Sequence, residues 1–199
     1  MKKYSMTLDK HTGLYRITLL IDLPGFKAGS VGGLIEKEAN LYHEGNAWVF
    51  GNARVYGNSK VFGDSLVSGN SWVYGDSRVF GDSQVSGDSL VSGNSWVSGD
   101  SLVSGNSWVS GNAQVYGNSW VSGNAQVFGD AWNTSPLYIQ GSQHSLTNSS
   151  YGKLTIGCET HTFDEWLENF ETIGKKNGYT KIEIVEYHEY IKLFKKVGR

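Results

Sequence analysis

The segment Cys158-Glu159-Thr160-His161 places a thiol and an imidazole within four residues of each other. A cysteine thiolate can act as a nucleophile when a neighbouring histidine accepts its proton. A zinc site needs about four ligands, and this segment offers only a thiol and an imidazole. Because single cysteines are commonly buried in the core, we predict a packed Cys158 and a helix-capping His161. We expect no catalytic residue, no metal and no cofactor.

A second chemical feature is the pairing of basic and aromatic residues in the middle of the chain. Arg54, Lys60 and Arg78 are each followed two positions later by an aromatic residue. Cationic groups beside aromatic rings suit a nucleobase or a phosphate, although they can also serve only to keep a surface soluble. We predict a ligand site made of Arg54, Tyr56, Lys60, Trp72, Tyr74 and Arg78.

The element that must position these side chains is a six-residue repeat. From Gly45 to Thr134 the chain divides into fifteen hexads, such as GNARVY and GNSKVF, without an insertion. Every hexad begins with Gly-Asn or Gly-Asp. Valine recurs at every sixth position from Val49 to Val127, and Asn133 takes its place in the last hexad. The residue two positions before each valine position is always Ala or Ser.

Alternation within a strand places the small residue and the valine on the same, inward side. Gly and Asn tolerate the positive φ of a tight corner, so each hexad reads as a short strand plus a corner. Three hexads then close a triangular coil of eighteen residues, and the array makes five coils. The predicted fold class is mainly β, a parallel β-helix.

This repeat resembles the left-handed β-helix of the hexapeptide-repeat transferases, and the left hand is implied by that resemblance. The segment from Gly13 to Leu41 looks like the leader of hexapeptide-repeat proteins of bacteriophages and prophages. The segment from Ile156 to Trp166 looks like their shared tail. The resemblance to the transferases also implies a homotrimer.

Acyl transfer on this fold usually needs a histidine base. The histidines are His11, His43, His144, His161 and His188. None lies within the hexads, although His43 and His144 flank them. An acyltransferase is therefore the third alternative for function.

A repeat of eighteen residues per coil arranges the outward side chains on three faces. The face without charge carries the column Trp48, Leu66, Gln84, Leu102 and Trp120. The column of Arg78 also contains Trp96 and Trp132, which we expect to point outward. Contiguous exposed Trp and Leu are unusual on a monomer, so we predict that a homotrimer buries the uncharged face.

The repeat divides the chain into three parts. Residues 1–44 are expected to cap one end of the solenoid, residues 45–134 form it, and residues 135–199 form a tail. The tail is predicted to contain strands at 137–139 and 153–156, followed by two helices. Thr162 with Glu165, and Thr180 with Glu183, have the spacing of capping boxes at the helix starts.

The composition restricts the class of protein further. A formal charge of −2 argues against binding to double-stranded nucleic acid or to a membrane surface. The start of the chain does not resemble a signal peptide, and we expect a cytoplasmic protein. The leading hypothesis is a non-catalytic phage accessory protein, a trimeric scaffold that sequesters a nucleotide immune signal of the bacterial host. The alternative is a structural or adhesive phage module.

Overall fold

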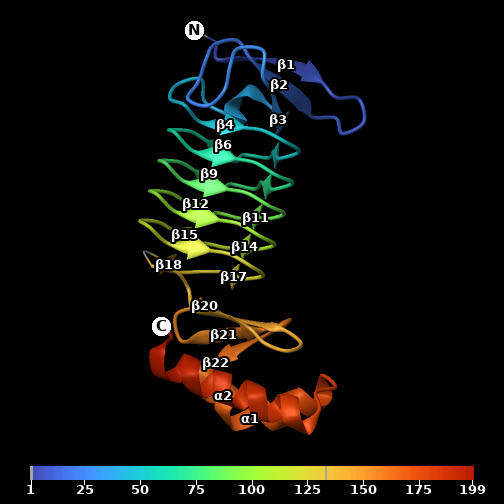
Figure 1. The fold of residues 1–199 in the computed structure, drawn as a ribbon, viewed down its shortest axis with the longest axis vertical. Helices are drawn as coiled ribbons and strands as arrows, with labels where there is room; N and C mark the ends of the chain where they lie inside the picture. Colours follow the sequence, from blue (N-terminus) through green and yellow to red (C-terminus); the bar gives the residue numbers. More distant parts are fainter. Residues whose placement is uncertain (1, 133) are drawn as a thin grey trace.

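The computed structural model describes residues 2–132 and 134–199. The molecule is elongated: a stack of short coils lies between N-terminal strands at one end and a sheet with two helices at the other (Figure 1). It is a mainly β protein built on a parallel β-solenoid, which confirms the predicted fold class. The left hand of the coil stays a prediction. No helix of the described residues is both long and apolar enough to cross a membrane.

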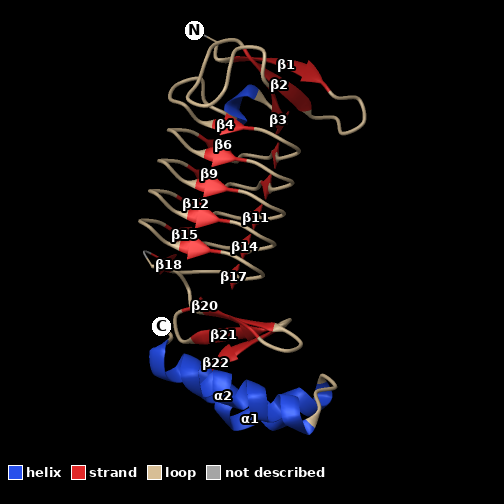
Figure 2. Cartoon of the chain, viewed as in Figure 1, coloured by secondary structure: helices blue, strands red, loops and turns tan. Residues whose placement is uncertain are grey.

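Each hexad except the last contributes a strand of two residues, the variable residue and the valine, and the corners between strands are loops (Figure 2). These strands are β4 (Trp48–Val49), β5 (Arg54–Val55), β6 (Lys60–Val61), β7 (Leu66–Val67), β8 (Trp72–Val73), β9 (Arg78–Val79), β10 (Gln84–Val85), β11 (Leu90–Val91), β12 (Trp96–Val97), β13 (Leu102–Val103), β14 (Trp108–Val109), β15 (Gln114–Val115), β16 (Trp120–Val121) and β17 (Gln126–Val127). Gly63 shows why glycine opens the hexads. It has a φ of 73°, and a Cβ there would lie 2.9 Å from the backbone nitrogen of Gly81 on the next coil.

Parallel pairing at a spacing of eighteen residues builds the three faces. One sheet has the order β4-β7-β10-β13-β16, so Leu66 pairs with Trp48 on one side and with Gln84 on the other. Two further sheets contain the β5 and β6 columns in the same way. Backbone hydrogen bonds join the coils, for example from the Leu66 N–H to the Ser83 carbonyl at 3.0 Å. The predicted register is therefore confirmed from Trp48 to Val127.

The interior of the solenoid consists of the valines and the small residues. All valines from Val49 to Val127 are fully buried, including Val91 and Val97. Most of the buried serines donate their hydroxyls to backbone carbonyls, which offsets the cost of burying them, whereas Ser89 Oγ has no partner among the described residues. Ser59 Oγ, for example, donates to the Tyr56 carbonyl at 2.7 Å and to the Val73 carbonyl of the next coil at 3.1 Å.

The solenoid begins before the first hexad. Strands β1 (Tyr4–Leu8), β2 (Tyr15–Leu19) and β3 (Val31–Ile35) form an antiparallel group, and β3 then pairs in parallel with β5. After the short 3₁₀ helix η1 (Glu38–Asn40), Leu41 bridges to Val61. Residues within 31–44 thus complete an additional coil. The expected five coils are about six, because the last part of the leader follows the solenoid path without the hexad motif.

The last hexad departs from the predicted register. In β18 (Ala131–Trp132), Ala131 pairs with Gln114 and Trp132 pairs with Val115. The positive φ falls on Asp130, at 64°, one residue after the glycine position. The prediction that Trp132 points outward is wrong: this one-residue slip turns the indole into the core, where it is fully buried. The predicted placement of Asn133 at the valine position lies outside the described residues.

The C-terminal part is a four-stranded antiparallel sheet with two helices packed on it (Figure 1). Its elements are β19 (Tyr138–Gln140), β20 (Ser145–Ser150), β21 (Lys153–Ile156), β22 (Glu159–Thr162), α1 (Phe163–Lys176) and α2 (Lys181–Val197). β19, β21 and both helices were expected, whereas β20 and β22 were not. Thr162 and Thr180 form the predicted capping boxes. The Phe128 N–H donates to the Ser149 carbonyl at 3.1 Å, so β20 continues the stack below the solenoid.

Candidate functional site

Two strands bring the first basic and aromatic cluster together on one face. Arg54 from β5 lies with its guanidinium carbon 5.4 Å from the ring centre of Trp72 on β8. Tyr56 and Tyr74, which follow these strands, stack with centroids 5.1 Å apart and planes 1° from parallel. Burial, and secondarily the neighbouring Tyr74, raises the pKa of Tyr56. The predicted contacts among these four residues are thus present.

The second cluster lies on the adjacent face. Arg78 from β9 lies 5.2 Å from the ring centre of Trp96 on β12, and the Lys60 ammonium lies 5.9 Å from the ring centre of Tyr42. Phe62 and Phe80 stack at 4.9 Å. Trp96 and Tyr42 were not among the predicted site residues. The spacing of eighteen residues from Arg78 could have identified Trp96, whereas Tyr42 lies in the additional coil outside the repeat.

The two arginines keep their polar edges available. Among the residues that the structure describes, neither Arg54 nor Arg78 makes a side-chain hydrogen bond or an ion pair; each contacts a tryptophan ring instead. An arginine has five N–H donors in one plane, which match a phosphate or carboxylate. The arrangement can therefore hold an anion at the edge of a guanidinium. The six predicted residues therefore form two clusters on two adjacent faces of the solenoid, not a single site.

The uncharged face differs from the prediction at its first residue. Trp48 is fully buried within its own chain, with Tyr4 and Phe26 each 6.4 Å away between ring centroids. A Cβ on Gly32 would lie 2.6 Å from the indole, so only glycine permits this approach. Trp48 is therefore not an interface residue. The column that faces outward is Leu66, Gln84, Leu102 and Trp120.

Several large apolar side chains remain exposed along the solenoid. Trp120, at the end of the uncharged column, is 61% exposed, and Trp108 on the next face is 49% exposed. Below Trp120 the surface continues into a hollow of about 710 Å³, whose lining includes Leu137 and Val197. The lining also contains polar residues, among them Ser122, Ser135 and Asn148, so the exposed tryptophans themselves are what is typical of an interaction site.

The histidine before the repeat has partners for both ring nitrogens. His43 Nδ1 accepts a hydrogen bond from the Lys3 backbone N–H at 3.1 Å, and Nε2 lies 2.6 Å from Glu38 Oε1. Hydrogen bonding to His43 and to Lys2 lowers the pKa of Glu38. This ring is held as part of the N-terminal cap. The other flanking histidine, His144, lies in the C-terminal part with Nδ1 2.6 Å from the Tyr179 hydroxyl.

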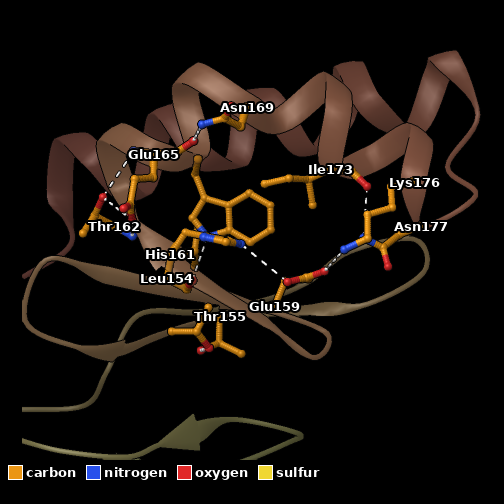
Figure 3. A network of polar contacts seen from close by, with 12 residues as sticks. Leu154, Thr155, Glu159, His161, Thr162, Glu165, Asn169, Ile173, Lys176 and Asn177 are labelled. Atoms are coloured by element: carbon orange, nitrogen blue, oxygen red, sulfur yellow. Dashed lines mark hydrogen bonds and ion pairs between the residues drawn. The ribbon is translucent and has the colours of Figure 1, made fainter.

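The thiol and imidazole near residue 160 are arranged differently from the prediction. Cys158 lies in the turn between β21 and β22 and is exposed, so the expected packed cysteine is wrong. His161 does not cap α1, because Thr162 does. The His161 ring instead meets Trp166 edge-on at 4.9 Å, and its Nε2 lies 3.5 Å from Glu159 Oε2 (Figure 3).

No family model matches the chain, and no curated protein matches it either. The resemblance to hexapeptide-repeat transferases and phage proteins therefore stays a prediction.

Proposed function

We propose that this protein is a non-catalytic, self-associating scaffold that binds a nucleotide on the first coils of its solenoid. The observation that supports this most directly is the placement of Arg54 and Arg78 over Trp72 and Trp96 with their N–H donors unpaired within the described chain. A rigid pair of ring and guanidinium suits a ligand that carries both a base and a phosphate.

The proposed assembly is a homotrimer that buries the uncharged face. Burial would cover Leu66, Leu102 and Trp120, whose apolar side chains otherwise contact water. The other two faces of neighbouring subunits would then converge on shared grooves, so that one ligand contacts two chains. In its most specific form the protein is a phage-encoded sponge that sequesters a nucleotide immune signal in the cytoplasm of the bacterial host.

Calorimetric titration with cyclic and linear nucleotides tests this function. Arg54→Ala and Arg78→Ala should each weaken binding by about 1–3 kcal/mol, the range for a hydrogen bond to a charged group. Arg54→Lys is the matched control for geometry, because it keeps the charge but loses the planar fork. We expect it to bind more weakly than wild type and more tightly than Arg54→Ala.

Two results would contradict the proposal. If no nucleotide in the panel binds, the proposed sequestration of a nucleotide is wrong. If nucleotides bind but neither arginine matters, the site lies elsewhere. Thermal unfolding of each variant supplies the stability control, and we expect little change because both arginines lie on the outer surface.

A structural or adhesive module is the second candidate. Trp72 and Trp108 stand exposed on the same face, two coils apart, with Leu90 between them. Coils spaced at strand distance would place the two indoles about 10 Å apart. A regular row of exposed apolar side chains suits binding to a partner surface that repeats at a similar spacing. Binding to such a surface that is abolished by Trp72→Ser and Trp108→Ser, and not by the arginine variants, would favour this candidate.

A hexapeptide-type acyltransferase is the third candidate. His43 is engaged at both ring nitrogens, which speaks against its use as a general base. Turnover of an acyl-coenzyme A donor that disappears with His43→Ala or His144→Ala would place the protein in this class instead.

A further inference from the structure

The C-terminal part contains a cavity away from the solenoid. It has a volume of about 240 Å³ and lies between β21 with its following turn and the two helices. Its apolar lining comes from Ile156, Trp166, Phe170, Ile173, Ile184 and Ile191. An apolar cavity of about 150 Å³ is large enough for benzene. This cavity therefore has room for a substituted aromatic ring.

The walls of the cavity are held in place by contacts outside it. Trp166 Nε1 donates to the Leu154 carbonyl at 2.7 Å (Figure 3), and Phe170 stacks on His188 at 3.9 Å. The Tyr187 hydroxyl accepts hydrogen bonds from two backbone N–H groups, those of Gln143 at 3.0 Å and His144 at 2.6 Å. Because these large side chains are anchored, they cannot easily close the space by changing rotamer.

Charge at the mouth of the cavity is balanced. Glu159 lies at the rim, 3.5 Å from the Lys176 ammonium, which is the main cause of the lowered pKa of Glu159 (Figure 3). The carboxylate is thus already paired. An apolar lining with a balanced rim favours a neutral ligand over an ion.

The polar group that remains for a ligand is His144, a solvent-exposed residue at the edge of the cavity. Its Nδ1 is 2.6 Å from the Tyr179 hydroxyl, whereas its Nε2 has no hydrogen-bond partner within the described part of the chain. The Tyr179 phenol is protonated at neutral pH even at its ordinary pKa, and burial raises that pKa further. In one tautomer Nε2 is a donor and in the other an acceptor, and a hydroxyl can pair with either.

We propose that this cavity is a binding site for a small, neutral, hydroxyl-bearing aromatic molecule. The ring occupies the apolar space between the sheet and the helices, and the hydroxyl hydrogen-bonds to His144 Nε2. This site does not depend on the proposed nucleotide function, since none of its lining residues belongs to the solenoid.

The experiment uses p-cresol and toluene as probes on the full chain. The only cysteine, Cys158, lines the rim and is exposed, so its rate of alkylation by N-ethylmaleimide reports occupancy. Saturating p-cresol should slow alkylation at least threefold. The concentration dependence gives the affinity of each probe, and toluene, which lacks the hydroxyl, should bind more weakly.

Two variants and one control locate the site. Ile173→Trp fills the cavity and should weaken p-cresol binding at least tenfold. Ile182→Trp places the same residue on α2 where the native side chain is 82% exposed, and should leave binding unchanged. His144→Leu removes the hydrogen-bonding group, and should weaken p-cresol about tenfold while leaving toluene unaffected.

Three outcomes would overturn the proposal. The first is that neither probe slows alkylation of Cys158 up to its solubility limit. The second is that a folded Ile173→Trp binds p-cresol as tightly as wild type. The third is that His144→Leu weakens both probes equally, which would mean a general loss of packing. If Ile173→Trp does not fold, the effect of His144→Leu on p-cresol compared with toluene tests the proposal by itself.

Discussion

At the scale of single residues, the glycines of the solenoid combine a backbone requirement with a spatial one. Gly81 has a φ of 71°, and a Cβ there would lie 2.9 Å from the Gly99 backbone nitrogen. We expect Gly81→Ala to lower the free energy of unfolding by about 1–3 kcal/mol, the range for a strained backbone residue. Gly129→Ala is the control, because Gly129 has no positive φ and an added Cβ meets nothing within 4 Å. Urea unfolding measures both, and equal losses would contradict the prediction.

Lys3 is a second residue with a measurable consequence. Its ammonium is buried at the top of the solenoid, where it donates to the Ala47 carbonyl at 2.8 Å. Burial lowers the pKa of Lys3 to about 8, although the charge of Asp64 opposes the shift. An unfolded lysine titrates near about 10.4, so the unfolded state binds more protons between about pH 8 and 10.

Because the unfolded state binds more protons than the folded state in this pH range, the direction of the pH dependence of stability is fixed. The contribution of Lys3 should make the free energy of unfolding rise as the pH increases from about 8 to 10. Lys3→Met cannot titrate and should lack this rise. Urea unfolding at several pH values compares the two proteins, and parallel curves would reject the lowered pKa.

At the scale of elements, the two ends of the solenoid are closed by tryptophans. Trp48 is covered by the N-terminal strands, and Trp132 turns inward at β18. The Trp132 indole Nε1 donates to the Gly129 carbonyl at 3.0 Å, so its polar group is satisfied. β4 and β18 are the terminal strands of their sheets, so each has a neighbouring strand on one side only, and a large side chain fills the space on the other side.

Removal of one such side chain gives a prediction for the element. Trp132→Ala should lower the free energy of unfolding by about 3–5 kcal/mol, the usual cost of emptying a buried aromatic position. Trp108→Ala is the matched control, because Trp108 is 49% exposed and should lose far less. Thermal or urea unfolding measures the difference. Similar losses in both variants would mean that Trp132 does not close the core.

At the scale of the whole molecule, the exposed apolar columns favour association. Leu66→Asp with Leu102→Asp should dissociate the proposed trimer to monomers, because a buried and unpaired carboxylate is costly. Leu90→Asp is the control: it occupies the same hexad position on another face, β11, and should leave the trimer intact. Light scattering after size-exclusion chromatography gives the masses. A monomeric wild-type protein would contradict the assembly outright.

The cations of the solenoid are also distributed unevenly over the whole molecule. Arg54, Lys60 and Arg78 lie on β5, β6 and β9, near the N-terminal end, whereas the later strands carry Trp, Leu and Gln. The proposed nucleotide site and the C-terminal cavity therefore lie toward opposite ends of the molecule (Figure 1). Variants at one site should not change binding at the other.

The amino-acid sequence alone determined the interior of the solenoid, its corners and its register from Trp48 to Val127. Each of these follows from local rules repeated without interruption: glycine at positive φ, a small residue and valine on one side, and eighteen residues per coil. It also determined both helix starts, because the capping boxes at Thr162 and Thr180 lie within four residues of chain.

Only the tertiary structure decided what happens where the repeat ends. The burial of Trp48 depends on strands far earlier in the chain. The inward turn of Trp132 depends on a one-residue shift in strand register that the hexad pattern does not predict. Tyr42, the partner of Lys60, comes from the additional coil outside the hexads. The cavity beside His144 arises where a sheet and two helices meet. Contacts between segments distant in the chain leave no periodic signal, so no reading of local pattern could have located them.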